Sequence, residues 1–207
     1  MASTSSSGSK NGLIIGAAGG LVVLLLVAAV IFGSEEIGAE FGSPELRGTS
    51  LPPFPSQQAS VDTSANGLAA PEIFGQDYTG IDVAIANDGR AKGIVFLAHW
   101  CQFCQREVPR VQAWLDAGGG VDGVDLYSVS TSVNSGRPNH PPSSWLDAEG
   151  WTIPLVVDDQ PLSLYRAYGG GGFPYWVFLH ADGTVGLRTA GELTIDELTQ
   201  ILNTLEQ

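Results

Sequence analysis

The chain has 207 residues, enough for one domain and an additional segment, and it carries 9 basic and 22 acidic residues for a formal net charge of −13. This acidic balance argues against nucleic acid as a partner, because proteins bind nucleic acid through basic surfaces. It also disfavours electrostatic attachment to anionic lipid headgroups.

The N-terminal part of the chain contains a candidate membrane segment. Residues 1–11 form a short Ser-rich tail, and residues 12–32 form an apolar stretch without a charged side chain. As a helix with a rise of about 1.5 Å per residue, this stretch would span roughly 30 Å, the thickness of the hydrocarbon core of a bilayer. A cleaved signal peptide is the alternative, but its apolar region is usually only about 7–15 residues long. We therefore expect an uncleaved transmembrane anchor at 12–32.

The charges that flank this stretch indicate its orientation. Lys10 precedes it, and three acidic residues follow it: Glu35, Glu36 and Glu40. Basic residues stay on the cytoplasmic side of a membrane, so we expect a single-pass protein with a cytoplasmic N-terminus. Three glycines recur every four residues within the stretch, a spacing that can pack two such helices into a homodimer: Gly12, Gly16 and Gly20.

After the anchor, we expect a flexible linker and one folded domain. Residues 33–70 are rich in Gly, Ser, Pro and Ala, a composition typical of a tether. Residues 71–207 alternate strand and helix patterns, which indicates an α/β fold. The expected strands are 94–98, 124–129, 153–157, 175–179 and 184–187. The expected helices run from residue 101 to about 117, around 143–147, over 162–168, and from a capping box at 194–197 onward.

The only two cysteines of the chain, Cys101 and Cys104, lie where the strand at 94–98 meets the following helix. A Cys-x-x-Cys spacing places both sulfurs in the first turn of one helix, where they can form and break a disulfide. The unpaired N–H groups and dipole of a helix N-terminus lower a cysteine pKa from about 8.5 to roughly 3.5–7.5. We therefore expect an exposed nucleophile at Cys101 and a buried resolving thiol at Cys104, working without a bound cofactor because the thiols carry the electrons.

Two other interpretations of the cysteine pair are weaker. A zinc site would need two further ligands at motif spacing, and the remaining candidates are three isolated histidines: His99, His140 and His180. We expect His99, next to the pair, to be a surface residue. A purely structural disulfide would close so short a loop that it would constrain the unfolded chain very little.

Several motifs resemble the thioredoxin family. Trp100 precedes the first cysteine, and Pro109 follows the second by five residues, as in the active-site helix of that family. Residues 172–179, which contain Phe173 and Pro174, resemble its cis-proline loop and the strand after it. The resemblance covers residues 71–207 and is strongest to the membrane-tethered, TlpA-like thiol–disulfide oxidoreductases of the bacterial envelope, a branch that includes cytochrome c maturation proteins.

The resemblance implies a thioredoxin fold, with a central mixed β-sheet flanked by helices and an inserted segment between its two halves. It also implies that Pro174 is a cis-proline that faces the cysteines and belongs to the catalytic centre. Trp100 and Phe173 would then contact the substrate, with the Phe173 backbone pairing with an extended client segment.

Glu107 matches an acidic residue that is common in the TlpA-like branch. It lies one helical turn after Cys104, so it could act in catalysis by passing protons to or from that thiol; a solvated helix charge is the alternative interpretation. Classical thioredoxin carries a buried acid six residues before its first cysteine, whereas this chain has Val95 there. That difference leaves Glu107 as the candidate proton acceptor.

These observations predict a thiol–disulfide oxidoreductase anchored in a bacterial cell membrane. It would act on protein thiols and disulfides outside the cytoplasm and exchange electrons with a membrane-embedded partner. The residues between the cysteines, Gln102 and Phe103, include neither a charge nor a histidine, which favours a reductant, with cytochrome c maturation as one role. The alternatives are an oxidase that forms disulfides in secreted proteins and a non-enzymatic metal carrier.

Overall fold

The computed structural model describes residue 1 and residues 40–55 and 60–205. The tail and the transmembrane anchor predicted at 1–11 and 12–32 therefore lie outside the described residues, except for Met1. Among the helices within the described ranges, none combines the length and the apolar composition that crossing a bilayer requires.

Six strands within the described residues form the central sheet, in the order β2-β9-β8-β5-β6-β7. Their bounds are β2 Val61–Asp62, β5 Ala91–Leu97, β6 Val124–Ser130, β7 Leu155–Val157, β8 Tyr175–Leu179 and β9 Val185–Ala190. β5 runs parallel to β6 and antiparallel to β8, with Val95 opposite Ser128 on one side and Trp176 on the other. The sheet is mixed, as the resemblance implied, and β5 lies inside it.

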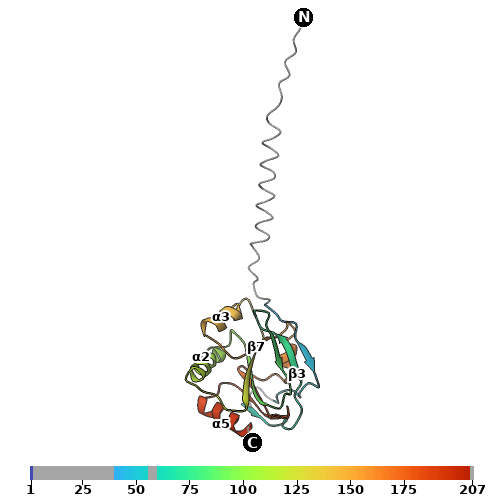
Figure 1. Ribbon diagram of the computed structural model, residues 1–207, viewed down its shortest axis with the longest axis vertical. Helices are drawn as coiled ribbons and strands as arrows, with labels where there is room; N and C mark the ends of the chain where they lie inside the picture. The colour runs from blue at the N-terminus through green and yellow to red at the C-terminus, as the bar shows by residue number, and fades with distance from the viewer. Residues whose placement is uncertain (2–39, 56–59, 206–207) are drawn as a thin grey trace. The chain divides into compact units, whose positions relative to one another are not determined.

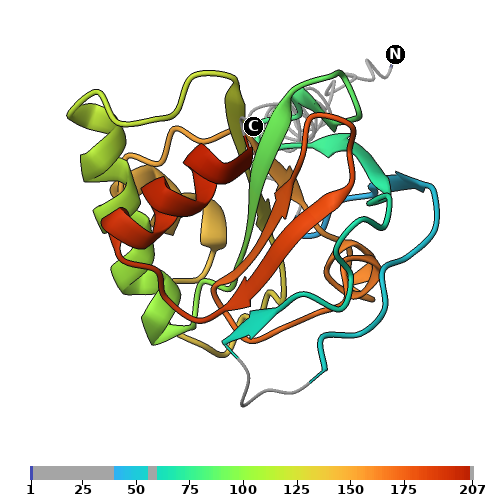
Figure 2. The same ribbon diagram turned by 90° about the horizontal axis from the view of Figure 1, so that it is seen from below.

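Helices pack against both faces of this sheet (Figure 1). Their bounds are α2 Gln102–Asp116, α3 Pro142–Ala148, α4 Ser163–Ala167 and α5 Ile195–Leu205. Figure 2 shows α2 and α5 against one face and α4 against the other. The face covered by α2 and α5 is called the helix face, and Val95 and Trp176 lie on it. The opposite face, covered by α4 and the N-terminal segment, is called the N-terminal face, and Ile94 and Tyr175 lie on it.

Alternate residues of the central strands separate two hydrophobic cores. Successive strand side chains point to opposite faces of a sheet. Val95 and Trp176 accordingly pack with residues of α2 and α5, whereas Ile94 and Tyr175 pack with residues of α4 and the N-terminal part of the domain. Both faces are covered, so β5 and β8 are buried at every position and appear in the sequence as continuous apolar runs.

The expected linker is partly folded, which corrects the prediction of a flexible tether over residues 33–70. Within its described part, this segment forms β1 (Glu45–Arg47) and β2 and buries Leu51 and Phe54 in the core of the N-terminal face. Leu51 also donates a backbone hydrogen bond of 2.8 Å to the carbonyl of Ala167 at the end of α4. The apolar residues of the segment are isolated among Gly, Ser and Pro, so no periodic pattern marked them as structured.

A second, three-stranded sheet in the order β1-β3-β4 completes the fold. β3 spans Glu72–Gln76 and β4 spans Asp82–Ile85, and both pairings are antiparallel. Ile73 of β3 and Ile85 of β4 are buried in the core of the N-terminal face. Residues on either side of the predicted boundary at residue 71 therefore belong to one folded unit.

The segment inserted between the two halves of the fold agrees with its prediction. The helix expected around residues 143–147 is α3, and its Trp145 and Leu146 are buried in the core of the helix face. α3 lies between β6 and β7, so it covers the same side of the sheet as α2.

Candidate active site

Cys101 and Cys104 lie at the start of α2, directly after the central strand β5. Cys101 is the N-cap residue, with an extended backbone, and its N–H donates to the carbonyl of Ala98 at 2.9 Å. This turn redirects the chain from strand to helix, so Cys104 falls within the first turn of α2. Both thiols are thus close to the unpaired N–H groups of a helix N-terminus.

Cys101 combines a low thiol pKa with little exposure. Its Sγ donates a 3.5 Å hydrogen bond to the carbonyl oxygen of Phe173, and only 8% of the residue is exposed. The expected exposed nucleophile is therefore largely covered, because the loop that contains Phe173 lies against its sulfur. The pKa of Cys101 falls to about 6, chiefly because the Cys104 thiol hydrogen-bonds to its sulfur; burial opposes this shift, and the N–H groups of Cys104 and Phe103 add to it.

Cys104 is fully buried in the core of the helix face. Burial raises the pKa of its thiol well above the ordinary value, and the hydrogen bond to Cys101 raises it further. The two thiols therefore differ in the way that stepwise exchange requires, since one ionises readily and the other keeps its proton.

The Phe173–Pro174 peptide bond is cis, as the resemblance implied. The Phe173 ring packs edge to face against the Trp100 ring, with 6.0 Å between centroids, so two aromatic side chains border Cys101. Pro174 is buried and has no N–H that could bond to a sulfur. The structure brings together the loop around Pro174 and the helix around Cys101, which are far apart in the sequence.

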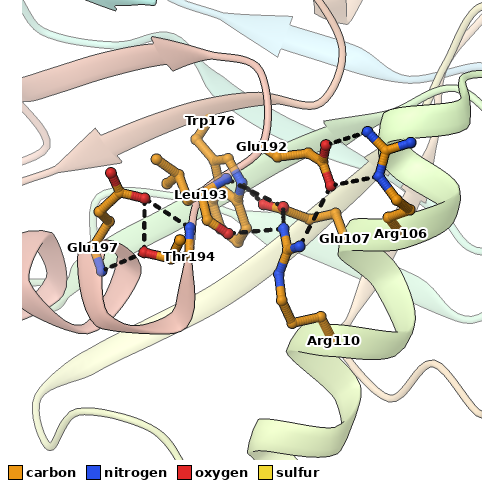
Figure 3. Close-up of polar contacts among 8 residues, drawn as sticks. All are labelled: Arg106, Glu107, Arg110, Trp176, Glu192, Leu193, Thr194 and Glu197. Carbon is orange, nitrogen blue, oxygen red and sulfur yellow. Dashed lines mark hydrogen bonds and ion pairs between the residues drawn. The ribbon is translucent and has the colours of Figure 1, made fainter.

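Glu107 is buried, with 1% exposure, so the interpretation as a solvated helix charge is wrong. Trp176 Nε1 donates to its Oε1 at 2.8 Å, and the Leu193 N–H donates to its Oε2 at 3.2 Å. Arg110 forms an ion pair with the same Oε2 (Figure 3). Burial raises the pKa of Glu107 above its usual range. The contacts with Trp176, Arg110 and Leu193 lower this pKa and offset part of the increase.

His99 is also buried, contrary to the expectation of a surface side chain. Its Nδ1 lies 2.7 Å from the carbonyl oxygen of Pro138, and its Nε2 accepts a 3.1 Å hydrogen bond from the N–H of Asn134. Since one ring nitrogen meets an acceptor and the other a donor, the neutral ring fits both, with Nδ1 donating. Burial lowers the pKa of His99, which agrees with this form. The ring therefore fastens the loop at 131–141 to the strand-to-helix turn.

The same loop reaches Trp100. Trp100 Nε1 donates to the carbonyl oxygen of Ser132 at 2.7 Å, and the guanidinium of Arg137 lies 5.2 Å from the centroid of its ring. This loop fixes the aromatic residue that precedes Cys101.

Sequence reasoning missed three charged residues near the cysteines: Arg110, Arg137 and Glu192. Arg110 had a usable signal, because it follows Glu107 by three residues on one helix, a spacing that brings side chains together. Glu192 contacts Arg110 from 82 positions away, and the contact of Arg137 with Trp100 depends on a loop with no periodic pattern. Neither contact could be read from local sequence.

The amino-acid sequence of this chain is similar to those of several known proteins. A model of the thioredoxin-like domain matches residues 80–206. Sporulation thiol-disulfide oxidoreductase A of Bacillus subtilis (strain 168) is 28% identical over 133 residues, which cover 64% of this chain and 79% of that protein. Thiol-disulfide oxidoreductase ResA of Geobacillus thermodenitrificans (strain NG80-2) is 29% identical over 144 residues, which cover 69% of this chain and 79% of that protein.

Solved structures show the same fold at lower identity. StoA from Bacillus subtilis is 23% identical, with a TM-score of 0.50 over 72% of this chain and 98% of its own. A thiol:disulfide interchange protein of the thioredoxin family from Chlorobium tepidum TLS is 21% identical, with a TM-score of 0.55 over 70% of this chain and 99% of its own.

Proposed function

The chain belongs to the thioredoxin-like family and is a thiol–disulfide oxidoreductase, and we propose that it acts as a membrane-anchored reductant of protein disulfides outside the cytoplasm. The observation that carries the proposal is the contrast between the thiols of Cys101 and Cys104. One is an N-cap residue with a pKa of about 6, and the other is fully buried with a raised pKa.

The proposed reaction starts at Cys101. Near neutral pH its thiolate attacks one sulfur of a client disulfide, the bond between the client sulfurs breaks, and the second client sulfur leaves as a thiolate. Cys104 then loses its proton and attacks Cys101 Sγ, which releases the first client sulfur and leaves a Cys101–Cys104 disulfide. Two electrons pass from the chain to the client, and a membrane-embedded partner would return them.

The client would bind beside the two aromatic residues that border Cys101. Trp100 and Phe173 offer an apolar contact, and the backbone before Pro174 offers hydrogen-bonding groups to an extended segment. In this proposal Glu107 takes the Cys104 proton, since burial has moved its pKa upward and toward the working pH.

The pKa of Cys101 supports the reductant over the oxidase. A value of about 6 lies closer to the roughly 7 of thioredoxin than to the roughly 3.5 of DsbA, a strong oxidant. Equilibration of the full-length chain with glutathione buffers should therefore give a reduction potential more negative than about −200 mV. A value near −120 mV would favour the disulfide-forming oxidase instead.

The proposal also includes attachment to a membrane and a role in cytochrome c maturation. The anchor rests on the uncharged stretch at 12–32, and protease treatment of intact spheroplasts should digest the domain after it.

The role in cytochrome c maturation rests on the resemblance to the TlpA-like branch. A peptide disulfide with a Cys-x-x-Cys-His haem attachment motif should then be reduced faster than a disulfide without that motif. Equal rates of reduction for the two peptides would mean that the protein is a general disulfide reductant without a preference for the haem attachment motif.

A further inference from the structure

Four functional side chains of the Cys101–α2 segment recur at three-residue intervals: Cys101, Cys104, Glu107 and Arg110. Helix residues three apart are neighbours, with about 5–6 Å between their Cβ atoms. The first three are buried, whereas the side chain of Arg110 is 34% exposed. The series therefore leads from the nucleophile, through the buried thiol and the buried carboxylate, to a cation at the surface.

Arg110 uses both terminal nitrogens of its guanidinium to join α2 to the loop that follows β9. One nitrogen forms the ion pair with Glu107 and also donates to the carbonyl oxygen of Leu193 at 2.8 Å. The other donates to Oε1 of Glu192 at 3.4 Å. In Figure 3, dashed lines join the guanidinium to both carboxylates. Its position is therefore fixed from two elements.

The charged and polar groups around Glu107 come from three elements. Cys104 and Arg110 belong to the same helix, Trp176 to β8, and the Leu193 N–H to the loop after β9. Glu192, on that loop, faces Glu107 across Arg110 and is itself paired with Arg106. Arg110 is thus the one cation that contacts Glu107 among the residues that the structure describes. An ionised carboxylate buried without a cation is costly, so the charge of Glu107 depends on Arg110.

We propose that Arg110 is a positioning residue for the resolving step, because it holds Glu107 ionised and oriented one turn from Cys104. This inference rests on the proposed function and on the proton transfer to Glu107 within it. The Cys104 thiol gives its proton to the Glu107 carboxylate, and the Cys104 sulfur attacks Cys101 Sγ. A new S–S bond forms between the cysteines while the bond from Cys101 to the client sulfur breaks, and that sulfur leaves as a thiolate. Without Arg110 the pKa of Glu107 would rise further, so a larger fraction of the carboxyl groups would already carry a proton and could not accept the one from Cys104.

One stopped-flow experiment separates the two chemical steps. The reduced full-length chain, purified in detergent, is mixed with the aromatic disulfide dithiobis(nitrobenzoate), whose thiolate is coloured. Attack by Cys101 releases the first coloured thiolate, and attack by Cys104 on the mixed disulfide releases the second. The rate of each phase is followed from pH 5 to 9 in the parent chain and in the variants.

Arg110→Gln should leave the first phase with its midpoint near pH 6, because the pKa of Cys101 is set chiefly by Cys104 and by the N–H groups at the start of α2. The second phase should become about 100-fold slower at pH 7, the lower end of the range for general acid–base catalysis, and its pH profile should move to higher pH. Arg110→Lys keeps the charge but has a single nitrogen, so it should recover part of the rate. Arg90→Gln, which removes an arginine paired with Asp125 elsewhere on the surface, should change neither phase.

The outcomes distinguish the inference from the proposed function. A parent chain that never releases the second coloured thiolate would contradict the Cys101–Cys104 exchange itself. An unchanged second-phase profile in Arg110→Gln, alongside a shifted profile in Glu107→Gln, would overturn the role of Arg110 only. Unchanged profiles in both variants would overturn the role of Arg110 together with that of Glu107. A first phase whose midpoint stays near pH 6 shows that each variant is folded around its nucleophile, because an unfolded thiol would ionise at about pH 8.5, so a lost second phase is then not a loss of fold.

Discussion

The two faces of the central sheet each bury a carboxylate paired with an arginine, and the two pairs differ. On the N-terminal face, Asp62 of β2 pairs with Arg188 of β9. Burial pushes the pKa of Asp62 upward, but hydrogen bonds from Ser64 and the Arg188 guanidinium outweigh it, so the pKa lies below its usual value. On the helix face, burial prevails and the pKa of Glu107 is raised.

The contacts of the two arginines differ as well. Arg188 is fully buried, and besides Asp62 it donates to the carbonyl oxygens of Pro52 at 2.7 Å and Tyr168 at 3.2 Å. It therefore ties the N-terminal segment and the end of α4 to the sheet. Arg110 is partly exposed and is shared between Glu107 and Glu192. A buried ion pair alone does not indicate function; what distinguishes the second pair is a carboxylate of raised pKa one helical turn from the buried Cys104 thiol.

The largest expected effect comes from the thiols themselves. Cys101→Ser should abolish disulfide exchange, because it removes the attacking thiolate, and Cys104→Ser should trap mixed disulfides, because it removes the resolving thiol. Non-reducing gels with a disulfide-bonded client would show the trapped species. Trapping by Cys101→Ser instead would reverse the two roles.

Removal of the ion pair on the N-terminal face should lower the free energy of unfolding without changing the rate of disulfide exchange. Arg188→Met leaves Asp62 buried without its cation, so the free energy of unfolding should fall by about 3–5 kcal/mol. Urea titration measures this loss, and the rate of exchange per folded molecule, measured in parallel, should equal that of the parent. A loss below about 1 kcal/mol would show that this pair is not the structural one.

The two carboxylates should give stability slopes of opposite sign with pH. The pKa of Asp62 is lowered by folding, so its contribution is complete above about pH 3.9 and is lost as the pH falls through the folded value. The pKa of Glu107 is raised, so its contribution is present below about pH 4.3 and is lost as the pH rises through the folded value.

Urea unfolding at a series of pH values tests these signs. Compared with the parent chain, Asp62→Asn should remove a rising slope at acidic pH, and Glu107→Gln should remove a falling slope above about pH 4.3. Each slope reaches at most about 1.4 kcal/mol per pH unit. Slopes of the same sign would mean that the two pairs are equivalent and that the comparison fails.

The smallest expected effect lies beside the Glu107 network, at the start of α5. The Thr194 hydroxyl accepts from the N–H of Glu197 at 3.2 Å, and the Glu197 carboxylate accepts from the N–H of Thr194 at 2.8 Å, which confirms the predicted capping box. Thr194→Ala should cost about 1 kcal/mol of unfolding free energy. Because Leu193 is adjacent, a simultaneous shift in the pH profile of exchange would show that this cap also orders the groups around Glu107.

The sequence was sufficient where the signal is local. The Cys-x-x-Cys pair between a strand pattern and a helix pattern predicted the placement of the cysteines, and the alternation of strand and helix patterns predicted the α/β fold. Motif resemblance added the loop at Pro174, which no local pattern would have brought to Cys101.

The sequence failed where a contact depends on residues distant in the chain or on isolated apolar residues. Leu51 and Phe54 form no periodic pattern, so the composition of residues 33–70 predicts a tether although the described part of this segment is folded. Whether His99 is buried is decided by a loop more than 30 residues later, which supplies both hydrogen-bond partners of its ring. The charge environment of Glu107 depends likewise on a distant loop, from which Glu192 and Leu193 reach the helix.

Alkylation tests most directly whether Cys101 is the attacking thiol and Cys104 the resolving thiol. The reduced full-length chain is treated with iodoacetamide at a series of pH values, and the modification of each cysteine is quantified by mass spectrometry. Cys101 should be modified with a midpoint near pH 6, well below the roughly 8.5 of an ordinary thiol, and Cys104 should remain unmodified over that range. Modification of Cys104 before Cys101, or a Cys101 midpoint near 8.5, would contradict the account.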